Sequence, residues 1–134
     1  MMKTFNLEIV TPDGAMFEGQ AESLLIKCES GDVEVLAGHA DLFAPLAVGR
    51  ARIKYDGKSR VASCAGGFLS VSKEKVMVVA TTFEFADEID VKRAKCAAEN
   101  AEAAIKDAKD DAALEKAKLK LSRALNRIRV SELK

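Results

Sequence analysis

The sequence predicts an α+β protein, in which an antiparallel β-sandwich or flattened barrel is followed by an antiparallel helical hairpin. All eight glycines and both prolines lie at or before residue 67, and all six phenylalanines and the single tyrosine lie at or before residue 85. From Ala86 onward the chain contains twelve alanines and no glycine, proline or aromatic residue. Turn-forming and aromatic residues favour short strands, whereas a stretch rich in Ala, Glu, Lys and Leu favours helix. We therefore expect a sandwich domain over residues 1–86 and a two-helix domain over residues 87–134.

The first part has the pattern of many short strands. Residues 5–9 alternate apolar and polar side chains, the period of a half-buried strand, and a Pro-Asp-Gly turn follows at 12–14. Asp56-Gly57 and the polar segment 72–75 each separate two strand-like runs, which predicts two hairpins. The further strands are expected over 16–28 with Gly19 as a bulge, and over 32–36, 50–55, 58–65, 68–71 and 76–80, with Gly66-Gly67 as an irregularity. Closely spaced turns with no helix between them indicate an antiparallel sandwich.

Two helical stripes occupy the second part, with apolar residues at alternating spacings of three and four. They are Val91, Ala94, Ala98, Ala101, Ile105 and Ala108 in the first helix, and Leu114, Ala117, Leu121, Ala124 and Ile128 in the second. We expect Asp90 to cap the first helix, Asp110 or Asp111 to cap the second, and the short link to fold them antiparallel. Because alanine buries little apolar surface, we hypothesise that the hairpin opens or detaches while its helices persist. A permanently docked pair is the alternative.

Charge is balanced overall but divided between the helices. Lys and Arg number 21 and Asp and Glu number 21, which argues against a generic nucleic-acid binder. Residues 82–111 carry nine acidic and five basic residues, whereas residues 112–134 carry two acidic and seven basic ones. The two helices either neutralise each other or offer a basic helix to an acidic partner once undocked.

Residues of the kinds that form catalytic and metal sites are sparse. There is one histidine, His39, and the three cysteines (Cys28, Cys64, Cys96) lie far apart, which indicates neither a metal site nor a disulfide framework and fits a reducing compartment. The apolar runs are shorter than the ~18 residues of a membrane span, and the start lacks the apolar core of a signal peptide. We expect a protein that is not an enzyme, requires no cofactor or metal, and is located in the cytosol.

Four segments stand out in order along the chain: V-T-P-D-G at 10–14, S-G-D-V-E-V-L-A-G-H-A at 30–40, A-G-G-F-L-S-V at 65–71 and N-R-I-R-V-S-E-L at 126–133. Together, and over essentially the whole chain, they resemble the epsilon subunits of bacterial rotary ATP synthases. Residues 10–14 look like the opening strand and turn of that family, and residues 30–40 are similar to its signature segment, although Ala37 stands where proline is usual. Residues 65–71 are close to its S-G-G-F-L-E-V strand, and residues 126–133 resemble its last turns.

The resemblance implies a sandwich of about ten strands followed by a helical hairpin, at the foot of the central stalk. There the sandwich would bind the gamma subunit and rest on the proteolipid rotor ring, coupling proton or sodium flow to ATP synthesis at the cytoplasmic face of the bacterial membrane. The ring contact maps onto Asp32, Gly38 and His39. The hairpin is implied to permit turnover when folded and to block ATP hydrolysis when extended, with Arg123, Arg127 and Arg129 facing the catalytic alpha and beta subunits.

One motif implies regulatory ATP binding. Residues 89–94 match the I/L-D-x-x-R-A pattern that binds ATP in some relatives, in which Asp90 would accept from the nucleoside and Arg93 would pair with phosphate. Glu84, Arg123 and Arg127 match further positions of that site. Asn100 stands where an arginine is expected, and losing one charge-assisted contact weakens binding by roughly one to two orders of magnitude. The plain structural alternative is that Asp90 only caps the helix and Arg93 is a surface cation.

Two other classes of function remain open at this point. One is a free-standing ATP-sensing adaptor, which would need neither gamma nor a ring. The other is an enzyme with a carboxylate-only site, which would need two acids converging in a cleft.

Overall fold

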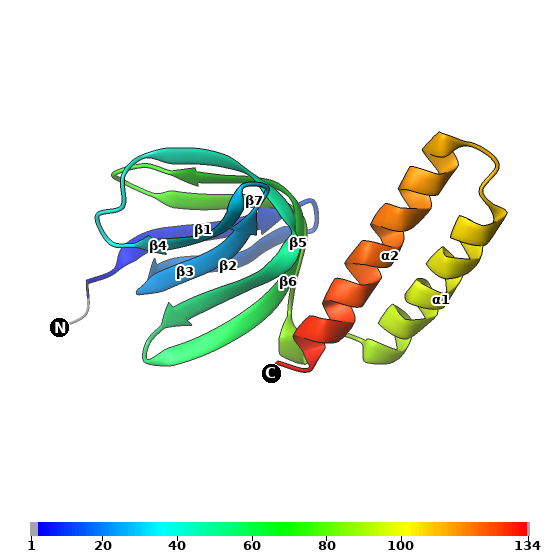
Figure 1. The fold of residues 1–134 in the computed structure, drawn as a ribbon. Coiled ribbons are helices and arrows are strands. Elements are labelled where there is room, and N and C mark those ends of the chain that lie inside the picture. The colour runs from blue at the N-terminus through cyan, green and yellow to red at the C-terminus, as the bar shows by residue number, and fades with distance from the viewer. Residues whose placement is uncertain (1–2, 134) are drawn as a thin grey trace. The chain divides into compact units, whose positions relative to one another are not determined.

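The computed structural model describes residues 3–133, which form two compact units that divide between Phe85 and Ala86. The first unit is all β, and the second consists of a short 3-10 helix and two α-helices (Figure 1). The expected α+β class is therefore confirmed.

One seven-stranded sheet makes up the first unit, in the order β2-β1-β7-β6-β5-β3-β4. The strands are β1 (Phe5–Thr11), β2 (Gly14–Ala21), β3 (Ser23–Cys28), β4 (Gly31–Leu36), β5 (Leu42–Tyr55), β6 (Lys58–Val71) and β7 (Val76–Phe85). The sheet curls into two layers, because β2 at one edge also contacts β5, where Phe17 and Tyr55 meet edge to face with ring centroids 5.1 Å apart.

The strand count differs from the implied ten, because β5 and β6 are each 14 residues long and belong to both layers. The sequence suggested that β6 breaks at Gly66-Gly67. Instead the chain passes through positive φ at both glycines and continues as one strand. A Cβ on Gly67 would lie 1.8 Å from the carbonyl oxygen of Val79, so only glycine fits this close approach. Conversely, the run expected as one strand over 16–28 is divided at Glu22 into β2 and β3.

The pairing is antiparallel throughout except between β1 and β7, which run parallel with Leu7 opposite Val76. The purely antiparallel expectation was wrong here. A tight hairpin forces neighbouring strands to be antiparallel, but β1 and β7 are joined through the whole sandwich and are free of that constraint.

Alternating side chains from both layers fill the core. The largest fully buried ones include Leu7, Ile9, Leu24, Ile26, Ile53 and Leu69. At about 1.5 to 3 kcal/mol for each large aliphatic side chain removed from water, this interior is the main source of stability of the first unit.

The second unit consists of η1 (Ala86–Glu88), α1 (Val91–Asp107) and α2 (Asp111–Ser131). Both expected caps are present: the Asp90 carboxylate accepts from the Arg93 backbone N–H, and the Asp110 carboxylate accepts from that of Ala113. Ala94, Ala98, Ala101, Ala117 and Ala124 are buried, whereas Ile105, Leu121 and Ile128 remain half-exposed. The helices therefore pack through small residues, as the sequence predicted. Neither helix is long and apolar enough to cross a membrane.

Candidate functional sites

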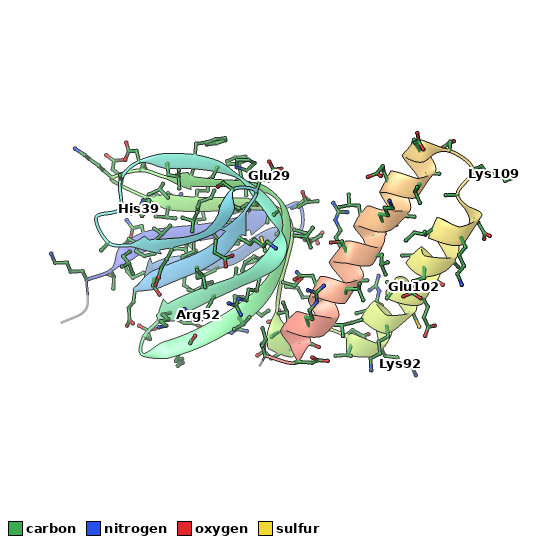
Figure 2. The ribbon with its side chains drawn as sticks, in the orientation of Figure 1. Glu29, His39, Arg52, Lys92, Glu102 and Lys109 are labelled. Atoms are coloured by element: carbon green, nitrogen blue, oxygen red, sulfur yellow. The ribbon has the colours of Figure 1, made fainter. Side chains whose placement is uncertain are left out.

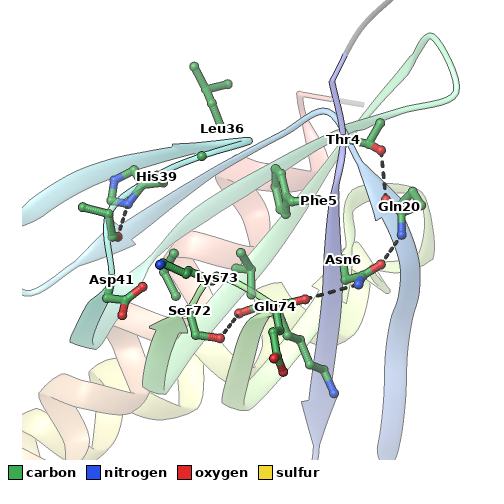
Figure 3. Close-up of a pocket in the computed structure, with 15 residues that line it drawn as sticks. Thr4, Phe5, Asn6, Gln20, Leu36, His39, Asp41, Ser72, Lys73 and Glu74 are labelled. Carbon is green, nitrogen blue, oxygen red and sulfur yellow. Dashed lines mark hydrogen bonds between the residues drawn. The ribbon is translucent and has the colours of Figure 1, made fainter.

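The open end of the barrel, here called the mouth, holds a cavity of about 730 Å³. Its walls come from the start of β1, the loop between β4 and β5, and the turn between β6 and β7 (Figure 3). Gly38 and His39, two of the three residues assigned to the ring contact, line it. Phe5 and Leu36 provide apolar lining, whereas Asp41 and Lys73 bring charge to the rim. The lining is mixed, and polar side chains from β1, β2 and the β6–β7 turn outnumber the apolar ones.

Hydrogen bonds hold the walls of the mouth in place. Thr4 Oγ1 donates to Gln20 Oε1 over 2.9 Å, Gln20 donates to Asn6 Oδ1, and Asn6 Nδ2 donates to the Glu74 backbone oxygen over 3.2 Å (Figure 3). This series of hydrogen bonds connects β1 and β2 to the β6–β7 turn.

On the opposite wall, His39 Nδ1 lies 2.7 Å from the Ala40 backbone oxygen. A carbonyl oxygen only accepts, so Nδ1 carries a proton and donates in this contact.

Asp32, the third residue assigned to the ring contact, does not lie at the mouth. On β4 it pairs with Lys27 beside the β3–β4 turn, while Leu36 at the other end of the strand pairs with Ser23. Asp32 and Leu36 are roughly 13 Å apart along the strand, and His39 lies beyond Leu36. Figure 2 shows Glu29 and His39 at the two ends of this region. Asp32 therefore lies near the β3–β4 turn, whereas Gly38 and His39 lie at the mouth.

A row of apolar side chains crosses the outer face of five strands, and the sequence analysis missed it. Strand register places them side by side, one from each strand: Pro45 (β5), Phe68 (β6), Val79 (β7), Val10 (β1) and Ala15 (β2). Phe43 lies in the next row, is 68% exposed, and stacks on Phe68 with ring centroids 4.9 Å apart. We call these six residues the apolar face. Contiguous exposed apolar surface of this kind marks interaction sites.

In the hairpin, the start of α1 lies beside the end of α2, because the helices are antiparallel around the short link at 108–110. Arg93 immediately precedes the buried Ala94, and Arg123 immediately precedes the buried Ala124. Residues at corresponding heptad positions of an antiparallel pair flank the same side of the seam. Arg127 lies one turn beyond Arg123 on that side. The hairpin thus gathers three of the four expected basic positions on one side.

Asn100, which replaces the fourth expected arginine, lies seven residues after Arg93 and shares its side of α1. Arg129 is exposed and is turned roughly 120° around α2 from Arg123. The three arginines assigned to the catalytic subunits therefore do not form one face. Glu84 lies on β7 opposite Ser63, in the first unit.

The Asp90 carboxylate accepts the Arg93 N–H over 3.0 Å as the helix cap, and one carboxylate has room for several further donors. Arg123 Nε is buried and has no hydrogen-bond partner among the described residues. Arg93, Arg123 and Arg127 are the cationic side chains in the hairpin that could pair with a phosphate group.

The described residues contain no group of three or more His, Cys, Asp or Glu side chains placed to hold a metal ion. Cys28 and Cys64 are buried and Cys96 is exposed.

Comparison with known proteins gives the family. The model of the β-sandwich domain of ATP synthase delta/epsilon chains matches residues 4–86, and that of their long α-helix domain matches residues 87–132. The ATP synthase epsilon chain of Bacillus velezensis is 40% identical over 130 residues, covering 97% of this chain and 98% of its own length. That of Bacillus cytotoxicus is 41% identical over 133 residues, covering 99% of this chain and all of its own.

Solved structures support the fold. A chain of the Euglena gracilis mitochondrial ATP synthase, from an OSCP/F1/c-ring structure, matches with a TM-score of 0.81 and 23% identity, covering 98% of this chain and 82% of that one. A chain of the central stalk and c-ring of the Tetrahymena thermophila enzyme matches with a TM-score of 0.68 and 14% identity, covering 96% and 97%. By the domain models and the bacterial relatives together, the chain belongs to the ATP synthase delta/epsilon family, as a non-catalytic epsilon subunit.

Proposed function

We propose that the chain is a central-stalk subunit that joins the gamma subunit to the proteolipid rotor ring of a bacterial ATP synthase. The observation that carries this proposal is the two-unit architecture, matched end to end by the two family domains over residues 4–132. The role is mechanical, since the subunit transmits rotation and needs no reactive group of its own. Its place is peripheral to the cytoplasmic face of the cell membrane, where proton or sodium flow drives the ring.

Gamma binds on the apolar face. Stable protein interfaces have an apolar, aromatic-rich centre surrounded by polar groups, and the row from Pro45 to Ala15 with the stacked Phe43 has this composition. The ring contact, in contrast, involves the hydrophilic β3–β4 turn, where Glu29, Ser30 and Asp32 are all polar.

Co-purification tests this proposal. Tagged full-length chain expressed with the other subunits should recover gamma and, from solubilised membranes, the ring proteolipid. A free-standing ATP-sensing adaptor would recover neither, and that result would reject the rotor assignment.

The hairpin regulates ATP hydrolysis by changing its position while its helices persist. Support comes from the seam, in which five alanines are buried and Ile105, Leu121 and Ile128 stay half-buried, with Val130 the one larger aliphatic side chain of α2 that is fully buried among the described residues. Each buried alanine contributes far less than the 1.5 to 3 kcal/mol of a buried leucine, so separating the helices costs little. Folded, the hairpin permits turnover. Extended, it presents the basic α2 to acidic segments of the catalytic subunits, through Arg123, Arg127 and Arg129.

Native-state hydrogen exchange on the full chain tests the loose seam. Amides of residues 91–131 should exchange through a lower-energy opening than those of β5 and β6. Protection of the hairpin equal to that of the sandwich would rule out easy opening.

ATP holds the hairpin in its folded state. Arg93, Arg123 and Arg127 lie on one side of the seam, where their guanidinium groups would pair with phosphate oxygens. Asp90 would accept from the nucleoside while it caps α1. With Asn100 in place of an arginine, the affinity is modest.

Calorimetric titration of the isolated chain with ATP measures this directly. Arg123→Gln should weaken binding by about tenfold or more, since a hydrogen bond to a charged group contributes about 1.5 to 3 kcal/mol. Arg129→Gln removes the same charge from another side of α2 and should leave binding within a factor of two. The absence of heat at millimolar ATP would reject the site.

A further inference from the structure

The last part of β7 is held by a neighbouring strand on one side only. β1 pairs with β7 over Val76–Val79, whereas β6 pairs with β7 as far as Phe85. Among the described residues, the stretch 80–85 is therefore bonded as an edge strand is. A strand end of this kind opens more easily than the centre of a sheet.

Side chains hold this strand end where a second strand does not. The Phe85 ring is buried, and the Phe83 ring meets it edge to face with ring centroids 5.3 Å apart. The guanidinium carbon Cζ of Arg60 lies 3.7 Å from the centroid of the Phe85 ring. A guanidinium this close to a buried ring makes a cation–π contact.

The register of the strands explains how Arg60 reaches Phe85. Phe85 lies opposite Ala62 in the last pair between β6 and β7. Arg60 lies two residues before Ala62 and shares its face of β6. Arg60 therefore occupies the first position on that face beyond the end of β7, and its side chain extends back over the Phe85 ring.

The chain that follows Phe85 belongs to the second unit. The Ile89 N–H donates to the Ala86 carbonyl oxygen over 3.4 Å, η1 contacts α2, and Asp90 caps α1. Residues 86–90 are thus bonded to the hairpin, whereas the residues up to Phe85 are bonded to the sheet. The connection between the two units is confined to the link between Phe85 and Ala86.

We propose that Arg60 fixes the hinge of the hairpin, because its contact with the Phe85 ring keeps the end of β7 in the sheet and confines the pivot to the Phe85–Ala86 link. This inference rests on the proposed movement of the hairpin. Without the contact, the end of β7 frays and residues 83–85 join the hinge. A longer hinge gives the hairpin more positions, so Arg60 limits the range of its movement.

Native-state hydrogen exchange on the full chain measures the fraying directly. In Arg60→Gln, amides of residues 82–85 should exchange roughly threefold to thirtyfold faster than in the parent chain, the range that a cation–π contact accounts for. Amides of residues 76–79, which lie between β1 and β6, are the internal reference and should keep their rates. Arg60→Lys keeps a cation over the ring and should recover part of the protection.

A double-mutant cycle isolates the contact with the ring, because Arg60 also has other interactions. In a Phe85→Leu background, Arg60→Gln should accelerate exchange of the same amides by less than about twofold, since no ring is left to contact. Equal acceleration in both backgrounds would mean that Arg60 acts through its other partners, and it would overturn the proposal. Arg50→Gln removes the same charge from an exposed position on β5 and should leave exchange of residues 82–85 unchanged.

Distances between two spin labels report the consequence for the hairpin. The full chain carries Cys96→Ser, which removes the exposed thiol and leaves the two buried ones. Asp13→Cys in the β1–β2 turn and Lys109→Cys in the link between the helices carry the labels. The distance distribution should broaden in Arg60→Gln by roughly 5 to 10 Å, the reach of one to three flexible residues. Arg50→Gln should keep the width of the parent chain.

The two readouts separate this inference from the proposed movement of the hairpin. If exchange of residues 82–85 accelerates in Arg60→Gln while the distances stay as narrow as in a single-position parent, the hairpin does not pivot and its regulatory movement is wrong. If the parent shows several positions of the hairpin and Arg60→Gln changes neither the exchange nor the width, the movement stands and the role of Arg60 is wrong.

Discussion

Phe43 and Phe68 stack on the outside of the sandwich with their ring centroids 4.9 Å apart, and Phe43 is 68% exposed. Phe43 contributes little to folding, because most of its surface stays in water in the folded chain. We therefore expect the Phe43–Phe68 pair to contact the gamma subunit.

Phe43→Ser should therefore separate binding from stability. Unfolding in urea should change by about 0.5 kcal/mol or less, as is usual at exposed positions, while the affinity for gamma should fall by roughly tenfold to a hundredfold, the range for loss of an aromatic anchor. Lys58→Ser, exposed at the start of β6, is the control and should change neither quantity. Unchanged gamma affinity in Phe43→Ser would remove the apolar face from the interface.

Gly67→Ala should destabilise the sandwich strongly. The residue has φ +94°, and a Cβ would lie 1.8 Å from the Val79 carbonyl oxygen, so the methyl group must displace backbone of β7. We expect a loss of about 3 kcal/mol or more in the free energy of unfolding, since steric displacement adds to the cost of left-handed backbone. Gly57→Ala is the matched control: its φ is also positive, at +72°, but a Cβ there meets nothing within 4 Å. It should cost only about 1 kcal/mol by urea denaturation.

The same two-glycine segment shows where sequence reasoning was sufficient and where it was not. Local patterns predicted the hairpin turns, both helix caps and the alanine seam, because each depends on neighbouring residues. Gly66-Gly67 was recognised as irregular, but whether the strand ends there depends on Val79, which is distant in sequence.

The candidate functional sites were likewise only partly predictable from local sequence. Asp32 and His39 are close in sequence, but only the register of β4 with β3 reveals that they lie at opposite ends of a strand. The apolar face had one local signal, since residues 76–80 are apolar without alternation, which indicates a strand covered on both faces. That signal does not identify the other strands that contribute to the row.

Stability should fall at alkaline pH through Cys64. Burial, with a smaller contribution from nearby Cys28, raises the pKa of the Cys64 thiol from its ordinary value of 9.0 to about 12. Between these values the unfolded chain releases this proton and the folded chain retains it. The free energy of unfolding therefore decreases by about 1.4 kcal/mol per pH unit as pH rises above 9.

Urea denaturation from pH 8 to pH 11 measures this slope, with Cys64→Ala as the comparison because other groups also titrate there. The variant should lose less stability across the range than the parent chain, even if it starts from a lower value. Parallel curves would show that Cys64 does not hold its proton.

Asn100→Arg should strengthen ATP binding. Position 100 lies on the same side of α1 as Arg93. This side faces the side of α2 that carries Arg123 and Arg127. The new guanidinium therefore adds a hydrogen-bond donor beside the existing arginines. One charge-assisted hydrogen bond corresponds to about tenfold to a hundredfold in affinity. Glu102→Gln makes the same change in net charge at an exposed position on the opposite side of α1, and it controls for general attraction of an anion to a more basic hairpin. Both variants are titrated with ATP by calorimetry. Equal gains in ATP affinity would mean that the added charge alone is responsible. A gain confined to Asn100→Arg places the phosphates along this side of the seam.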